Sequence, residues 1–393
     1  MNYILFDDPL TRKQLLPFTF TRPVSEIRIG ILSIREKWEK ISGQKVSVNT
    51  EKYLAEKYPL YVSKKEDNIW INGNILPTAE LCKAIKSLKK LESLNFGKIL
   101  IALNTGKETF ENSAGKIKSK EWKGEPVMQV NHLWDIFSLN GEALERDFKL
   151  LTKGKKSAKV SKTNSLLGNK FFIEKGAKLE CVILNSTTGP IYIGKDTEIM
   201  EGSVIRGPFA LCEGAVIKAG AKIYGPTTVG PHSKVGGEVS NSVIFGYSNK
   251  GHDGFLGNSV IGEWCNLGAD TNTSNLKNNY STVSIYDHSS GKMVSTGLTF
   301  CGLMMGDHSK CSINTMFNTG TVVGVCANIF GGDFPPKFVP SFSWGGSAGF
   351  VKYELNKAFE TAQRVFERRH KQFDNTEKAI LKEVLSLTRK SEL

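Results

Sequence analysis

The sequence predicts an α/β domain, then an all-β parallel β-helix, then a short helical tail. Three observations support this fold class. Strand-like and helix-like segments alternate over the first 150 residues, aliphatic residues then recur every six positions, and an amphipathic helical pattern ends the chain. At 393 residues, with 40% hydrophobic and 23% charged residues, the chain has the length of two domains and the composition of a globular protein.

Residues 1–150 are expected to form a mostly parallel sheet covered by helices, because β-type and α-type segments alternate there. Gly43 and Gly97 stand where helix C-caps are expected, and Thr78 where an N-cap is expected. The expected strands are 2–6, 45–49, 98–103 and 126–130, and the expected helices are 30–42, 78–94 and 140–151.

A period of six governs the chain from about residue 170. Aliphatic residues occupy eight consecutive six-residue positions from Ile193 to Val235, with glycines crowded between them, and the period resumes from Met305 to Ile329. Neither a helix nor an alternating strand has this period, whereas a hexapeptide β-helix places one inward aliphatic on each side of its coil. The separation of Leu267 and Met305 is not a multiple of six, so the intervening segment is expected to leave the coil as a loop.

The formal net charge of +13 suits anionic partners. Phosphorylated small molecules fit this charge better than nucleic acid, because no nucleic-acid-binding motif accompanies it. Residues 151–168 form a lysine-rich linker between a domain at 1–150 and a β-helix at 169–346. No stretch has the length of a membrane span or the pattern of a signal peptide, so we expect a cytoplasmic protein with no membrane partner.

Residues 347–393 are expected to form C-terminal amphipathic helices. Leu355, Phe359, Ala362 and Phe366 would lie on one apolar face of the first helix, opposite lysines and arginines. Such a helix can bind a membrane, but packing back on the β-helix is the more ordinary interpretation.

The candidate catalytic residue is His252. Hexapeptide β-helices are most familiar as acyltransferases, in which a histidine accepts the proton of the attacking group. His252 lies between glycines where the period of six breaks, whereas His232 and His308 occupy regular turns. On spacing alone, a solvated turn histidine is the more ordinary interpretation at each place. No closely spaced histidine pair is present, so no metal site is expected.

The stretch containing His252 resembles the acetyltransferase half of the bacterial GlmU family. In that family, glucosamine-1-phosphate N-acetyltransferase is joined to N-acetylglucosamine-1-phosphate uridylyltransferase. The matching residues are Gly251-His252, Leu256-Gly257-Asn258, the run from Asn266 to Thr271, and Asn275-Leu276, without a gap.

This resemblance implies roles for individual residues. His252 would be the general base and Asn266 would contact the sugar. The backbone at Ala269 and the side chain of Asn275 would meet acetyl-CoA.

The residues that grip the acceptor phosphate in the family are changed in this chain. Phe255 stands in place of a tyrosine and Ser240 in place of a lysine. Lys222 and Lys250 could supply positive charge from other positions.

The N-terminal stretch resembles the opening of sugar nucleotidyltransferases. The run LLPFTFTRP matches their signature, with Arg22 in place, but Asp7, Asp8 and Pro9 occupy the expected glycine-rich loop. Acidic side chains would repel a triphosphate, and proline removes a backbone donor. Arg12 and Arg22 remain the candidate nucleotide-binding residues.

We therefore expect a divergent GlmU-family protein with a degenerate nucleotidyltransferase-like domain and, by resemblance, a left-handed β-helix. The expected activity is acetyl-CoA-dependent N-acetylation of an amino-sugar phosphate by a homotrimer. Mg²⁺ is expected only if the N-terminal domain is active. The alternatives are an enzyme that retains both uridylyl and acetyl transfer, or a catalytically silent regulatory or scaffold subunit.

Overall fold

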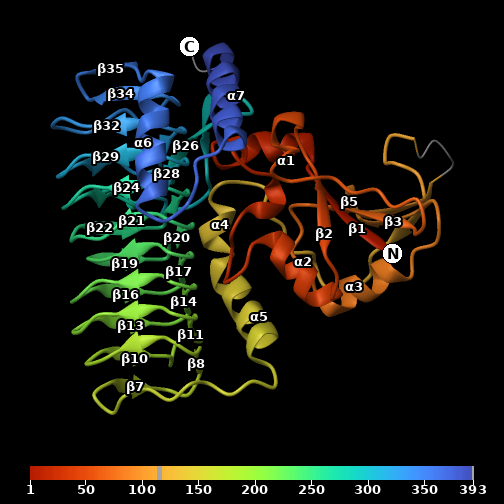
Figure 1. Ribbon diagram of the computed structural model, residues 1–393, viewed down its shortest axis with the longest axis horizontal. Coiled ribbons are helices and arrows are strands. Elements are labelled where there is room, and N and C mark those ends of the chain that lie inside the picture. Colours follow the sequence, from red (N-terminus) through yellow and green to blue (C-terminus); the bar gives the residue numbers. More distant parts are fainter. Residues whose placement is uncertain (113–116, 392–393) are drawn as a thin grey trace. The chain divides into compact units, whose positions relative to one another are not determined.

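The computed structural model describes residues 1–112 and 117–391 (Figure 1), with side chains described as far as residue 389. The last two residues of the expected helical tail lie outside the described residues. The chain divides into two compact units. The first comprises residues 1–15, 21–27 and 32–132, and the second comprises 16–20, 28–31 and 133–393. The domain boundaries expected from the sequence remain a proposal.

The first unit is built on a six-stranded sheet in the order β2-β1-β3-β5-β4-β6. Its strands are β1 (Asn2–Phe6), β2 (Val46–Asn49), β3 (Asn68–Asn72), β4 (Glu92–Phe96), β5 (Ile99–Gly106) and β6 (Lys118–Glu121). The sheet is mixed, because β5 runs antiparallel to both β3 and β4. The expectation of parallel pairing is therefore correct for β1 with β2 and β3 and for β4 with β6, and wrong for the two pairings of β5.

Three helices belong to this unit, namely α1 (Pro9–Gln14), α2 (Ile34–Ser42) and α3 (Ala79–Lys86). Helix α2 begins later than expected because Ser33 forms a capping box with Glu36. Helix α3 begins after the expected Thr78 cap but ends at Lys86. The last residues of the expected helix, from Glu92 onward, belong to β4 instead. The expected strand at 126–130 is reduced to an isolated bridge between Ile75 and Gln129.

The second unit is a left-handed parallel β-helix with three faces (Figure 1). Face A contains β7 (Ser165–Leu167), β10 (Ile183–Asn185), β13 (Val204–Arg206), β16 (Lys222–Tyr224), β19 (Glu238–Ser240) and β22 (Phe255–Gly257). Face B contains β8 (Phe171–Ile173), β11 (Ile191–Ile193), β14 (Phe209–Leu211), β17 (Thr227–Val229), β20 (Val243–Ile244), β23 (Val260–Ile261), β28 (Met304–Met305), β31 (Val322–Val323) and β33 (Phe338–Val339).

Face C contains β9 (Lys178–Leu179), β12 (Glu198–Ile199), β15 (Val216–Ile217), β18 (Lys234–Val235), β21 (Asn249–Lys250), β24 (Asn266–Leu267), β29 (Lys310–Cys311), β32 (Asn328–Ile329), β34 (Ser343–Gly346) and β35 (Gly349–Lys352). Strands β25 (Asn272–Thr273) and β30 (Met316–Phe317) pair separately. The expected loop contains a hairpin of β26 (Ser284–Asp287) and β27 (Lys292–Ser295).

The core of the coil consists of the six-residue aliphatics. All thirteen positions named by the period, from Ile193 to Val235 and from Met305 to Ile329, are at most 5% exposed. Small residues and positive φ angles mark the corners. The corner residues His232, Tyr247, Trp264 and His308 form an aromatic ladder, in which Tyr247 stacks on Trp264 with ring centroids 4.2 Å apart.

Four helices complete this unit: α4 (Asp135–Ser138), α5 (Asn140–Thr152), α6 (Leu355–Glu367) and α7 (Asn375–Ser391). Helix α6 packs back on the coil, because Phe366 stacks on Trp264 with centroids 3.9 Å apart. This packing confirms the ordinary interpretation of the tail. Among the described residues, no helix is long and apolar enough to cross a membrane.

Candidate active site

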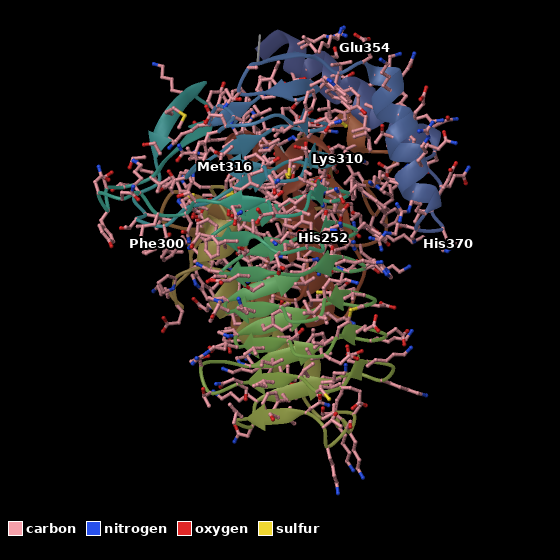
Figure 2. All side chains as sticks on the ribbon, turned by 90° about the vertical axis from the view of Figure 1, so that its left-hand side faces the viewer. His252, Phe300, Lys310, Met316, Glu354 and His370 are labelled. Carbon is pink, nitrogen blue, oxygen red and sulfur yellow. The ribbon has the colours of Figure 1, made fainter. Side chains whose placement is uncertain are left out.

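His252 lies in a tight turn at the corner between face C and face A, about midway along the coil (Figure 2). The turn joins β21 to β22 and contains Gly251, Asp253 and Gly254 besides the histidine. Gly254 has φ +109°, and a Cβ there would lie 2.3 Å from the carbonyl oxygen of Thr271. The glycine therefore lets the turn lie against the next turn of the coil, which leaves His252 exposed on the outside.

A groove of about 630 Å³ opens beside this histidine. It is lined by Met200, Lys218, Ala219, Gly236, Gly237, Gly251, His252, Asp253, Ala269 and Asp270. Ala269 accepts a hydrogen bond from the Asn314 N–H at 2.8 Å, and its own N–H donates to no other described residue. The groove thus brings the His252 imidazole and the Ala269 residue together, and acyl transfer uses a proton acceptor and a backbone donor.

Lys250 lies inside the coil rather than in the groove. It pairs in register with the inward-facing Val235 and is only 3% exposed. Its Nζ donates to the carbonyl oxygens of Gly236 at 3.0 Å, His252 at 2.8 Å and Asp253 at 3.4 Å. Burial, partly offset by Asp253, lowers the pKa of Lys250 to about 8. Lys250 therefore holds the backbone of the His252 turn.

The remaining expected site residues are spread over neighbouring surfaces. Asn266 projects from face C and accepts a hydrogen bond from the Asn249 side chain at 2.9 Å. Asn275 is half-buried and donates to the Asn258 side chain at 2.8 Å. Lys222 is exposed on face A and does not line the groove. Of the candidates, only His252 and Ala269 share one groove.

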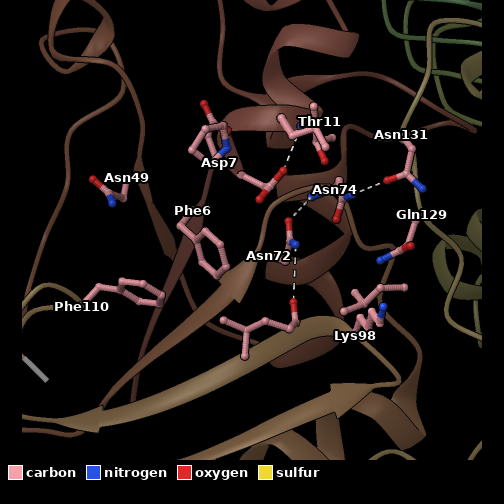
Figure 3. Close-up of a pocket in the computed structure, with 15 residues that line it drawn as sticks. Phe6, Asp7, Thr11, Asn49, Asn72, Asn74, Lys98, Phe110, Gln129 and Asn131 are labelled. Atoms are coloured by element: carbon pink, nitrogen blue, oxygen red, sulfur yellow. Dashed lines mark hydrogen bonds between the residues drawn. The ribbon is translucent and has the colours of Figure 1, made fainter. Parts of the chain in front are cut away.

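A pocket of about 660 Å³ in the first unit lies at the carboxyl ends of β1, β2 and β3 (Figure 3). Such a sheet edge is the usual ligand site of an open α/β sheet. Its polar lining includes Asp7, Asp8 and five side-chain amides, those of Asn49, Asn72, Asn74, Gln129 and Asn131.

Asp7 is buried and accepts hydrogen bonds from Thr50, from the Val24 N–H and from Arg12. Burial raises the pKa of Asp7 although the Arg12 guanidinium opposes this shift. Arg12 also donates to the carbonyl oxygen of Arg22 and to the Tyr53 hydroxyl. Arg12 and Arg22 are both buried, so Arg12 neutralises Asp7 instead of extending into the pocket. Among the described residues, no group of three or more acidic, histidine or cysteine side chains is arranged to hold a metal ion.

This chain is similar to several known proteins. Residues 3–156 match the family model of sugar nucleotidyl transferases. A bifunctional sugar-1-phosphate nucleotidylyltransferase/acetyltransferase of Sulfurisphaera tokodaii is 29% identical over 219 residues, which is 55% of this chain and 48% of that protein. A bifunctional GlmU of Methanococcus maripaludis is 29% identical over 218 residues, covering 56% and 46%. The chain is similar to GlmU proteins over about half of its length.

The likeness is partial in extent. The matches cover about half the length of these two relatives. YaiX of Escherichia coli, which is named as an uncharacterized acetyltransferase, is 28% identical over 144 residues, or 36% of this chain and 62% of that one. Among solved structures, the UDP-N-acetylglucosamine acyltransferase of Francisella novicida covers 59% of this GlmU-like chain and 90% of its own, at 14% identity and a TM-score of 0.31.

Sequence reasoning missed a set of basic residues beside Asn266. Lys234, Lys310, Arg368 and Arg369 line a second groove on face C. The run ERRHK at 367–371 was noted only as the polar side of a helix. No sequence signal links these residues, because they come from three segments that only the coil and α6 bring together.

Proposed function

We propose that this protein is an acetyl-CoA-dependent N-acetyltransferase that acts on an amino-sugar phosphate, with His252 as the general base. The observation that carries the proposal is the exposed His252 imidazole over a groove that also contains the backbone of Ala269. A bifunctional relative with acetyltransferase in its name supports the same reaction class. A homotrimer that binds acetyl-CoA and a sugar phosphate belongs to the proposal.

In the proposed reaction the acceptor amine attacks the thioester carbonyl carbon while His252 takes a proton from the amine. The carbonyl oxygen becomes negative and is stabilised by a backbone N–H near Ala269. When the carbon–sulfur bond breaks, CoA leaves as a thiolate that recovers the proton. Lys250 donates hydrogen bonds to two carbonyls of the turn and to Gly236 of the preceding coil, so the imidazole starts from a restricted backbone position.

Uridylyl transfer is not part of the proposal. A triphosphate in the pocket of the first unit would meet Asp7 and Asp8 as well as Lys98, and Arg12 is already engaged by Asp7. The five amides of that pocket suit neutral hydroxyl or amide groups better than a chain of phosphates.

The test measures free CoA thiol released from acetyl-CoA with a panel of amino sugars and their phosphates. His252→Asn should lower the rate by about 10²–10⁴-fold, the usual contribution of a general base. His370→Asn is the matched control, because His370 is also exposed but does not line the groove. Equal rates for His252→Asn and the parent would refute the role of His252. Failure of every acceptor with the parent would favour a silent regulatory or scaffold subunit.

A further inference from the structure

Face C carries a row of aligned polar side chains beside the His252 turn. Lys234, Asn249, Asn266 and Lys310 occupy the same outward position on four successive strands. With strands about 4.8 Å apart, the two lysines stand about 14 Å from each other with the two amides between them. The row includes Asn249 of β21, the strand that leads into the His252 turn.

The end of helix α6 closes this row into a groove of about 420 Å³, which we call the basic groove. Arg368 and Arg369 follow the last turn of α6 and line the groove, and Tyr247 and Trp264 form its wall. Trp264 is stacked between Tyr247 and Phe366, so the wall is rigid and holds the end of α6 against face C.

The lining of the basic groove is positively charged. Its lining consists of Lys234, Tyr247, Asn249, Trp264, Cys265, Asn266, Lys310, Val365, Arg368 and Arg369, with no carboxylate among them. Within the described part of the chain, none of its four cationic side chains forms an ion pair. Burial first, and then neighbouring positive charges, lower the pKa of both Lys234 and Arg369. Positively charged side chains this close together repel one another, and a bound anion would reduce this repulsion.

The amide pair gives the groove a second chemical character. The Asn249 side chain donates to the Asn266 side-chain oxygen, which leaves other amide donor and acceptor positions facing the groove. Amides recognise hydroxyl groups, whereas the arginine guanidiniums match the geometry of phosphate oxygens.

We propose that the basic groove binds a phosphate monoester carried on a hydroxylated ring, with Arg368, Arg369 and Lys234 on the phosphate and the asparagine pair on the ring. Binding here does not require His252 to be catalytic, but the choice of ligands rests on the proposed function. The basic groove would supply positively charged side chains for a phosphate, which Ser240 and Phe255 cannot supply. Two ligands share this chemistry, namely an amino-sugar phosphate and the ribose 3′-phosphate of CoA.

Isothermal titration calorimetry with four compounds tests the proposal. CoA is compared with dephospho-CoA, and glucosamine 1-phosphate with glucosamine, on the full chain. The double variant R368A/R369A and the single variant Lys234→Ala remove the phosphate contacts. Arg364→Ala is the control, because Arg364 is an exposed cation on the same helix outside the groove.

The expected result is at least a tenfold loss of affinity in R368A/R369A for one phosphorylated compound, a smaller loss in Lys234→Ala, and no change in Arg364→Ala. The compound that loses affinity identifies the source of the phosphate. The proposal is overturned if R368A/R369A and Arg364→Ala bind all four compounds alike or if the parent binds none of them. An equal loss for phosphorylated and phosphate-free partners also overturns it, because the arginines would then only maintain the shape of the groove. If the parent acetylates an acceptor but binds no phosphate in the basic groove, the proposal for the groove is wrong and the proposed role of His252 is unaffected.

Discussion

Replacing Lys250 with methionine should change how the stability of this protein depends on pH. Methionine has a similar length and suits the inward position that Lys250 shares in register with Val235. The variant loses a buried titratable group together with three hydrogen bonds to backbone carbonyls, two of them in the His252 turn. Water at the exposed corner can replace part of those bonds, so the diagnostic quantity is the pH dependence rather than the stability at one pH.

The magnitude follows from the shifted pKa. Burial lowers the pKa of Lys250 from 10.5 to about 8, and at 1.36 kcal/mol per unit this corresponds to about 3 kcal/mol. Between these two pH values the unfolded chain binds more protons than the folded chain, so the free energy of unfolding rises with pH. Below about pH 8 both states are protonated, and the cost of the buried charge is constant.

The assay is urea denaturation of the parent and of Lys250→Met between pH 7 and 10.5, followed by circular dichroism. The difference in unfolding free energy, parent minus variant, should increase by about 3 kcal/mol over that range. Lys222→Met serves as the control, because it removes an exposed lysine from face A and its difference should stay flat. A flat difference for Lys250→Met as well would refute the argument that Lys250 is buried and charged at neutral pH.

Three further substitutions probe the ladder, the acidic loop and the core. Trp264→Ala should destabilise the protein by about 3–5 kcal/mol and expose the α6–α7 connection to protease, because it removes the ring against which Phe366 stacks. Asp7→Asn should cost about 3–5 kcal/mol in thermal unfolding, because it removes the buried carboxylate that pairs with the buried Arg12 guanidinium at 3.1 Å. Ile223→Ala, inside face A, should cost about 2–5 kcal/mol in urea denaturation.

Each substitution has a matched comparison. Trp344→Ala removes a tryptophan that is 38% exposed, and protease cleavage after α6 as fast as in Trp264→Ala would contradict the stacking argument. Glu51→Gln removes the exposed carboxylate near Arg12 and should cost less than about 1 kcal/mol, so an equal loss would contradict the importance of Asp7. Ile183→Ala, 40% exposed on the same face, should change stability by less than about 0.5 kcal/mol.

The sequence alone determined the repeating part of this protein. Every position that the period of six assigned to the core is buried, because each side of a β-helix repeats the same local environment. The strand at 2–6, the start of the helix after Thr78 and the helical tail were also predictable, since each depends on local patterns or caps. The residues around His252 also indicated the relationship to GlmU proteins before any geometry was known.

Only the tertiary structure decided where the individual charges point. Lys250 was expected to be a surface contact, yet the shortened turn of the coil after Val235 places it on an inward position. The mixed order of the first sheet and the engagement of Arg12 by Asp7 depend on strand pairings between distant segments. The basic groove unites β18, β21, β24, β29 and the end of α6, which no local pattern connects. Repetition is encoded locally, whereas the neighbours of a charge are set by long-range packing.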